Sequence, residues 1–229
     1  MKFNPVKCKI MTLGLKKKQI LQDYKMKGKP LSRVKEQKYL GIIISDNLSW
    51  ESNYCHSVSK ATKILGLLRR NIHQCSKETK SKAYKALVRP HLEYAAEVTD
   101  PYQTKYVKML DRVQRRSARF STSDYRQTSS VTKIMESLKW DPLKDRRRRA
   151  RLWQFYQIHN GNSPVTCSRL HKRVNDRPSR NFSFNTYDRI QTRTDRYKNS
   201  FFPRTIVDWN NLPNLITQQP TLEQFRLCC

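Results

Sequence analysis

The sequence predicts a mainly α-helical protein with a small β-strand region at its N-terminus, a helical bundle after it, and an irregular basic segment at the end. Three observations support this. Strand-like runs occur only before Trp50, apolar residues recur at three- and four-residue steps from there to Gly161, and the residues that follow are polar and rich in arginine. We therefore divide the chain into residues 1–50, 51–161 and 162–229, the last ending in an apolar cluster.

Charge dominates the composition. The 229 residues include 47 Lys and Arg against 18 Asp and Glu, a formal net charge of +29. So large an excess repels itself unless a polyanion is near, and nucleic acid is the commonest such partner. We therefore expect RNA and DNA as partners, bound by the phosphate backbone, and no small-molecule substrate.

The sequence contains no apolar run near the ~20 residues that a membrane helix needs, and residues 1–10 lack the apolar core of a signal peptide. The six cysteines are scattered except for Cys228 and Cys229. We expect an intracellular protein, in the nucleus or cytoplasm, without a membrane partner or a disulfide framework.

Strands are expected in three places before Trp50. Residues 9–13 favour a strand, and the alternation at Tyr24 and Met26 before a Gly28 turn predicts a hairpin. The β-branched run KYLGIII at residues 38–44 predicts one buried or half-buried strand, closed by the turn-forming pair Asp46 and Asn47.

Three helices are expected next. The first spans about 52–73, with Lys60, Lys63, Arg69 and Arg70 outside its apolar stripe. The second starts near Ser76 and is kinked or ended by Pro90, which has no amide hydrogen to donate, although residues 91–96 could resume it. The third spans about 104–120, and basic residues crowd the faces outside its apolar one: Lys105, Lys108, Arg112, Arg115, Arg116 and Arg119.

Two further helices and a packed tail complete the prediction. A short helix begins after Ser129 and Ser130, whose hydroxyls would cap it, and buries Val131, Ile134, Met135 and Leu138. The next has Asp141 as N-cap and Pro142 at its first position, carries the arginines near 146–151, and ends near Asn160 and Gly161. We expect residues 170–200 to be irregular. The last apolar residues should pack back on the helices: Phe201, Phe202, Ile206, Trp209, Leu212, Leu215 and Ile216.

No catalytic or metal site emerges from the residues. Two-metal phosphoryl chemistry needs paired carboxylates, and no Asp-Asp or Asp-x-Asp pair occurs. The spacing of Asp141 and Asp145 fits a cap and an arginine partner better than a metal site. Phosphate-binding glycine frames and zinc-finger spacings are absent, and Cys167, His171 and His159 could form a zinc site only as a minor alternative. We expect no cofactor in this chain.

Aromatic residues leave two alternatives open. Trp153, Phe155 and Tyr156 could stack on bases, but on an amphipathic helix we favour a core position. Tyr39, beside Gly41, could let the backbone approach a nucleic-acid strand closely.

Several motifs, in this order, resemble one family. They are FNPVKCK at 3–9, KYLGIII at 38–44 with NLSW at 47–50, RPHLEYA at 89–95, VQRRSARF at 113–120, LKWDPL at 138–143, and NSFFPRTI at 199–206 with WN and LP shortly after. In order and spacing they resemble the C-terminal part of reverse transcriptases from non-LTR retrotransposons of the LINE type, jockey-like elements among them. The resemblance covers nearly the whole chain.

The resemblance implies roles by position. Asn4, Lys7 and Cys8 match the end of the palm, and Tyr39, Leu40 and Gly41 match the primer-grip hairpin. Residues 50–161 look like the helical thumb, which holds template and primer by the backbone. Its expected nucleic-acid contacts are Arg69, Arg70, Arg115, Arg116, Arg119, Arg146, Arg147 and Arg148.

The chain also departs from the family. The catalytic aspartates lie before the Asn4 motif, so fingers and most of the palm are expected to be missing, and the family's Val-Trp-Asp-Pro stands here as Val98-Thr99-Asp100-Pro101. The complete enzyme would use Mg²⁺. We expect a fragment of an RNA-directed DNA polymerase that binds template-primer but is inactive alone. The alternative is a stand-alone basic helical nucleic-acid-binding protein derived from a retroelement.

Overall fold

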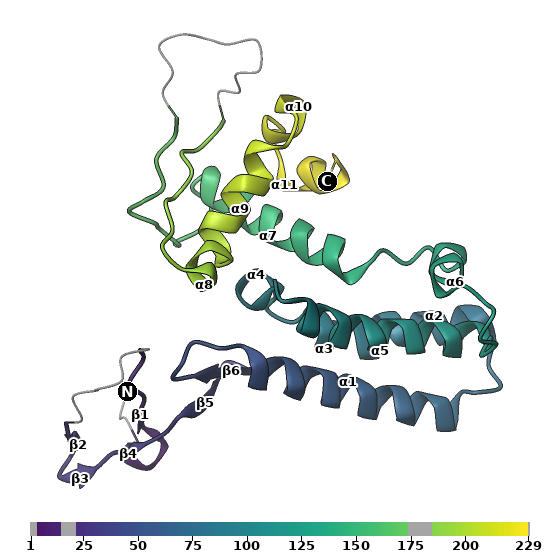
Figure 1. The fold of residues 1–229 in the computed structure, drawn as a ribbon, viewed down its shortest axis with the longest axis horizontal. Helices are drawn as coiled ribbons and strands as arrows, with labels where there is room; N and C mark the ends of the chain where they lie inside the picture. The colour runs from purple at the N-terminus through teal and green to yellow at the C-terminus, as the bar shows by residue number, and fades with distance from the viewer. Residues whose placement is uncertain (1–3, 15–21, 174–184, 229) are drawn as a thin grey trace. The chain divides into compact units, whose positions relative to one another are not determined.

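Helices make up most of the chain, and a few short strands lie near its N-terminus (Figure 1). The computed structural model describes residues 4–14, 22–173 and 185–228. The predicted mainly α class is therefore confirmed.

The helices are α1 (Glu51–Asn71), α2 (Lys77–Ala83), α3 (Arg89–Glu93), α4 (Ala96–Thr99), α5 (Thr104–Thr122), α6 (Val131–Ser137), α7 (Leu143–His159), α8 (Asp195–Lys198), α9 (Phe201–Asn210), α10 (Asn214–Thr217) and α11 (Leu222–Cys228). Two other helical segments are η1 (Pro5–Lys7), a 3₁₀ turn, and η2 (Tyr84–Val88), a π-helical turn.

The first strands are short. β1 (Lys9–Ile10) pairs in parallel with β4 (Ser32–Arg33). The predicted hairpin near Gly28 is confirmed, since β2 (Lys25–Met26) pairs antiparallel with β3 (Lys29–Pro30).

The run at residues 38–44 is not one strand, as predicted, but a hairpin. β5 (Glu36–Tyr39) pairs antiparallel with β6 (Ile42–Ser45), and Tyr39 lies opposite Ile42. Leu40 and Gly41 form the two-residue turn, with φ of 46° and 84°. Positive φ at both central residues is what a type I′ turn requires, and the exposed Leu40 adopts it despite its side chain.

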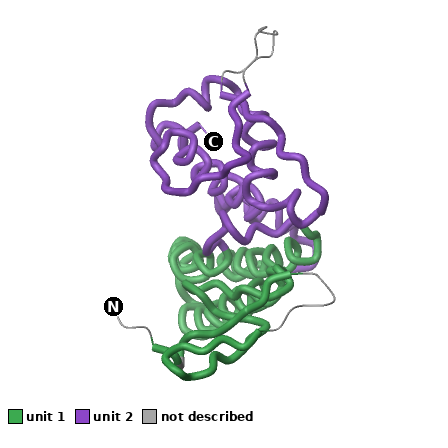
Figure 2. The backbone as a smooth tube through the Cα atoms, turned by 90° about the vertical axis from the view of Figure 1, so that its left-hand side faces the viewer, with its two compact units in different colours: residues 1–92, 103–125 green, residues 93–102, 126–229 purple. Residues whose placement is uncertain are grey.

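The chain forms two compact units, which Figure 2 distinguishes by colour. Unit 1 comprises residues 1–92 and 103–125, and unit 2 comprises 93–102 and 126–229. Each unit combines parts of more than one predicted segment, because residues 93–102 pack with the later helices and α5 packs with α1.

The core of unit 1 lies between α1, α5 and the helical segment from α2 to α3. Buried apolar residues line it at helical spacing: Ala61, Leu65, Leu68, Tyr84, Val88, Leu92, Leu110 and Val113. The rings of Tyr54 and Tyr106 lie 5.0 Å apart, near the start of α1 and of α5. The helices predicted at 52–73 and 104–120 are therefore confirmed.

Pro90 does not end its helix, which is distorted in the turn before it. The turn before it, η2, is π-helical, and the Arg89 N–H donates to the Tyr84 carbonyl, five residues back. Widening of this turn accommodates a proline that can neither donate nor tolerate a carbonyl four residues before it. The helix then continues as α3 and ends at Glu93, and Ala95 in the following turn has a φ of 51°.

Helix caps agree with the prediction in part. The expected start of α2 near Ser76 is confirmed, and the Ser76 hydroxyl caps the helix by accepting from the Thr79 N–H. Ser130 makes no side-chain cap bond to α6, and α7 has Pro142 rather than Asp141 as its N-cap. The Asp141 carboxylate pairs with Arg149 instead.

Unit 2 is built on α7, with α9 and α11 packed against it. The fully buried residues of its core include Leu152, Phe155, Ile206, Trp209 and Phe225, which confirms that the tail packs back on the helices. Phe155 and Tyr156 are core residues, as favoured above. Leu215 was expected in the cluster but is exposed, because α10 turns it outward.

The predicted irregular segment is irregular where the structure describes it. One bridge joins Lys172 to Tyr187, and α8 (Asp195–Lys198) is short. Residues 174–184 lie outside the described residues.

Candidate nucleic-acid interface

The basic residues of α5 share one face of the helix. At about 100° per residue, all six project within an arc of about 100°. The opposite side is buried and carries Tyr106, Leu110, Val113, Ser117 and Phe120. The residues of this α5 basic face are Lys105, Lys108, Arg112, Arg115, Arg116 and Arg119. Burial of the apolar side thus fixes the direction in which the cations point.

Four cations of the α5 basic face have no partner in the part of the chain that the structure describes: Lys108, Arg112, Arg115 and Arg116 are exposed, without an ion pair or a hydrogen bond. From Lys105 to Arg119 the face extends about 21 Å along the helix axis at about 1.5 Å per residue. That is the axial length of about six base pairs. The face can therefore meet several phosphates at once.

The residues at the two ends of the α5 basic face, Lys105 and Arg119, make hydrogen bonds within the chain. Lys105 Nζ donates to Glu51 Oε1 at 2.8 Å, and this hydrogen bond raises the pKa of Lys105 and lowers that of Glu51. At the other end, Arg119 Nη1 donates to the Asp124 carbonyl at 3.3 Å.

Arg69 and Arg70 lie exposed in the last turn of α1. The Arg69 guanidinium carbon is 5.6 Å above the centre of the Tyr125 ring, just after α5. Because Lys105 pairs with Glu51 at the other end, α1 and α5 run in the same direction. Arg69 at the C-terminal end of α1 therefore lies near the C-terminal end of α5.

A positive field also acts on His91 in α3. Burial lowers the pKa of its imidazole, and the Lys60 ammonium lowers it further. His91 is therefore neutral at pH 7.

The arginines of α7 are placed differently from those of α5. Arg146 pairs with Glu93, and its Nη2 donates to Glu93 Oε2 at 3.1 Å. Arg147 is buried, only 2% exposed. Arg148 is exposed, with Nε 3.3 Å from Asp208 Oδ1. Of the three α7 arginines that were expected to contact nucleic acid, Arg146 and Arg148 pair with acidic residues and Arg147 is buried.

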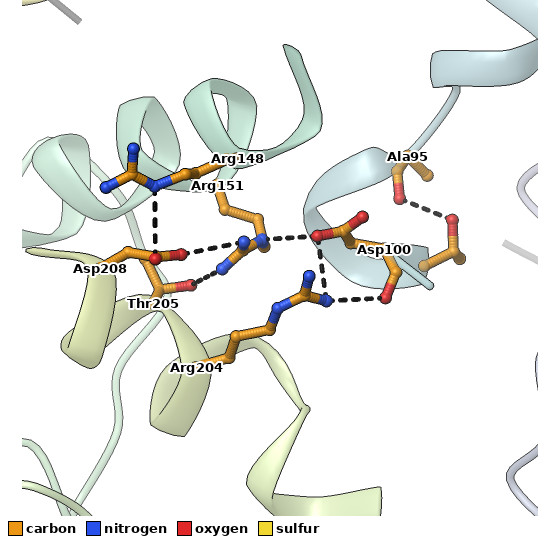
Figure 3. Close-up of polar contacts among 8 residues, drawn as sticks. Ala95, Asp100, Arg148, Arg151, Arg204, Thr205 and Asp208 are labelled. Atoms are coloured by element: carbon orange, nitrogen blue, oxygen red, sulfur yellow. Dashed lines mark hydrogen bonds and ion pairs between the residues drawn. The ribbon is translucent and has the colours of Figure 1, made fainter. Parts of the chain in front are cut away.

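Arg148 belongs to a network of three arginines and two aspartates, the unit 2 ionic network: Arg204, Asp100, Arg151, Asp208 and Arg148 (Figure 3). Arg151 lies at its centre. Its Nε is 2.9 Å from Asp100 Oδ2 and its Nη2 is 3.0 Å from Asp208 Oδ2. This network joins α7 and α9 to Asp100, the residue that follows α4, so these arginines hold unit 2 together.

Tyr39 and Leu40 stand at the tip of the β5–β6 hairpin, 63% and 74% exposed. Gly41 completes the turn with its positive φ. The hairpin that the resemblance implies at these residues is present, and their role toward a primer remains a prediction.

The sequence predicts Lys105, Lys108 and Arg112 among the basic residues outside the apolar face of the helix, but they are not among the expected nucleic-acid contacts. Their spacing from Arg115 and Arg116 was the signal available. Lys80 was missed entirely, because nothing in the sequence predicts that this lysine of α2 is buried.

Among the described residues, no three His, Cys, Asp or Glu side chains lie close enough together to hold a metal ion. His159 instead contacts Tyr187 and Trp209. None of the helices within the described ranges has the length and apolar character needed to cross a bilayer.

Comparison of the chain with protein-family models, with curated proteins and with solved structures gives no match in any of the three.

Proposed function

We propose that the chain is the C-terminal part of a non-LTR retrotransposon reverse transcriptase and binds template-primer nucleic acid through its phosphate backbone. The observation that carries the binding proposal is the α5 basic face, with four cations that have no partner in the described part of the chain. Phosphates are the ligands that such a row of exposed arginines suits best. The ordered motifs from residues 3 to 213 support the family.

This mode of binding reads no base sequence. The exposed side of α5 presents lysine and arginine in a line and no aromatic residue, since Tyr106 and Phe120 are buried. Contacts to phosphate position a duplex but do not distinguish base pairs. Two duplexes of unrelated sequence should therefore bind equally well.

The test is fluorescence anisotropy with two 20-base-pair duplexes of unrelated sequence over a range of salt. We expect equal affinities and a linear fall of log affinity with log salt. A tenfold preference for one sequence, or an affinity that salt does not change, would contradict the proposal.

Polymerisation is not expected from this chain alone, since its sequence contains no Asp-Asp or Asp-x-Asp pair to hold two metal ions. A primer-extension assay with Mg²⁺ or Mn²⁺ tests this point. Nucleotide incorporation would refute it.

The same lack of paired carboxylates supports a second candidate, a stand-alone basic nucleic-acid-binding protein derived from a retroelement. Sequencing the transcript distinguishes the two. An in-frame palm with paired aspartates supports the polymerase, and a transcript without one supports the stand-alone protein.

A further inference from the structure

Lys80 of α2 is a buried lysine without an acidic partner. It is 4% exposed, and its Nζ donates to Ser123 Oγ at 2.8 Å. The same Nζ lies 5.4 Å from the centre of the Phe120 ring. Within the ranges that the structure describes, no carboxylate pairs with Lys80. A buried ammonium ordinarily needs an anion nearby, and a hydroxyl with a ring face compensates it only in part.

Ser123 connects this buried charge to the surface. It is exposed directly after α5, with φ of 55°. Because Oγ accepts a hydrogen bond from Lys80, the hydroxyl hydrogen remains available to donate outward, and the ammonium strengthens it as a donor. Serine hydroxyls are common partners of backbone phosphates.

Further cations surround Ser123. The Arg119 guanidinium donates to the carbonyl of the next residue, Asp124, and Arg69 stacks on Tyr125. Side chains from α1, α2 and α5 thus converge on residues 119–125. A helix C-terminus by itself disfavours an anion, by the equivalent of roughly half a charge, and Lys80 supplies a full positive charge at that point.

We infer that Ser123, backed by Lys80 and flanked by Arg119, anchors one backbone phosphate at the C-terminal end of the α5 basic face. This inference rests on the proposed function. The exposed cations attract phosphates but leave the duplex free to shift along the helix. A hydroxyl held by Lys80 fixes one phosphate, and so sets the position of the duplex along α5.

The test compares Ser123→Gly with Ser130→Gly, the same change at an exposed serine whose side chain makes no cap bond. Glycine suits the positive φ of residue 123, but the change also removes the Oγ that accepts from the buried Lys80 ammonium, so we expect some loss of thermal stability and compare binding well below both melting temperatures. We expect Ser123→Gly to bind a 20-base-pair duplex about five- to tenfold more weakly, with an unchanged salt slope, because no charge is lost. Ser130→Gly should bind as wild type does.

A second variant, Lys80→Met, removes the charge and keeps the length of the side chain. It should weaken binding at least as much and reduce the salt slope by up to about 0.9. If Ser123→Gly binds as tightly as wild type while wild type shows salt-dependent binding, the anchor is refuted and the proposed function stands. If wild type shows no salt-dependent binding, the proposed function fails, and the anchor fails with it.

Discussion

Arg151 Nε donates to Asp100 Oδ2 at 2.9 Å, and both side chains are almost completely buried, at 3% and 7% exposure. The two residues are 51 positions apart. The Arg151 guanidinium also pairs with Asp208 and donates to the Thr205 hydroxyl at 3.3 Å. One arginine therefore connects α7 to α9 and to the residue that follows α4.

Removal of Arg151 should strongly destabilise unit 2. Breaking a buried ion pair costs about 3–5 kcal/mol where the partner is left uncompensated; here Arg204 still pairs with Asp100 and Arg148 with Asp208, so the cost should be about 2–3 kcal/mol. We expect Arg151→Met to lower the free energy of unfolding of unit 2 by about this amount in urea titrations that follow the buried Trp209. Arg148→Met is the control, because that side chain is 44% exposed and its pair should contribute less than about 1 kcal/mol. Equal losses of stability in the two variants would contradict the expectation that Arg151 contributes more than Arg148.

Glu51 should limit nucleic-acid binding, because it occupies Lys105 at the end of the α5 basic face. Glu51→Gln removes a negative charge there and frees a cation. We expect the affinity for duplex at low salt to rise about two- to threefold and the salt slope to steepen by up to about 0.9. Glu136→Gln makes the same change in net charge at an exposed site on α6. A similar gain in both variants would mean that net charge, and not Lys105, governs binding.

His159 should make unit 2 less stable in mild acid. Burial lowers its pKa to about 4, with a smaller effect from Lys172, and raises the pKa of Tyr187 to about 12. At pH 7 the tyrosine hydroxyl is therefore protonated and can donate to the neutral imidazole, whose Nδ1 is 2.7 Å away. The unfolded chain, with a histidine pKa near 6.5, binds a proton that the folded chain excludes.

The sign follows from this difference in proton binding. His159 does not affect stability above about pH 6.5, and it reduces stability as pH falls from there toward 4. Between pH 7.5 and 4.5 we expect the free energy of unfolding of the wild type to fall by about 1 kcal/mol more than that of His159→Gln, after allowance for the partial exposure of His159. Unfolding titrations at pH 7.5 and 4.5 measure it. If the wild type loses no more stability than His159→Gln over this pH range, burial does not lower the pKa of His159 as stated.

Replacing Leu40 in the β5–β6 turn with a residue that favours positive φ should stabilise the hairpin. Leu40 has a positive φ and is 74% exposed, so its side chain contributes little packing. Asparagine adopts this conformation more readily, and Asn-Gly is the favoured type I′ pair. We expect Leu40→Asn to stabilise the hairpin by about 0.5–1 kcal/mol, measured by hydrogen exchange of the β5 and β6 amides. Faster exchange in the variant would show that Leu40 has a packing role.

The sequence predicted α1, α5 and α7 well because long amphipathic helices repeat one pattern over many turns. The same spacing also placed Arg115 and Arg116 on the exposed side of α5. Periodicity could not show that Glu93 and Asp208 meet the arginines of α7, because those contacts span more than 50 residues of sequence. It also missed the turn at Leu40, since leucine is rare at positive φ and the surrounding β-branched run favours a strand.

The central claim is that the α5 basic face, and not the net charge of +29, binds nucleic acid. Two variants with equal net charge test it, each with four cations changed to glutamine. One changes Lys108, Arg112, Arg115 and Arg116, and the other changes four exposed cations of unit 2, Lys133, Lys144, Arg189 and Arg193. The measurement is the slope of log affinity for a 20-base-pair duplex against log salt. We predict that the first variant loses about 3–4 of that slope, at about 0.9 per phosphate contact, and that the second keeps the wild-type value. Equal loss in both variants would contradict the claim.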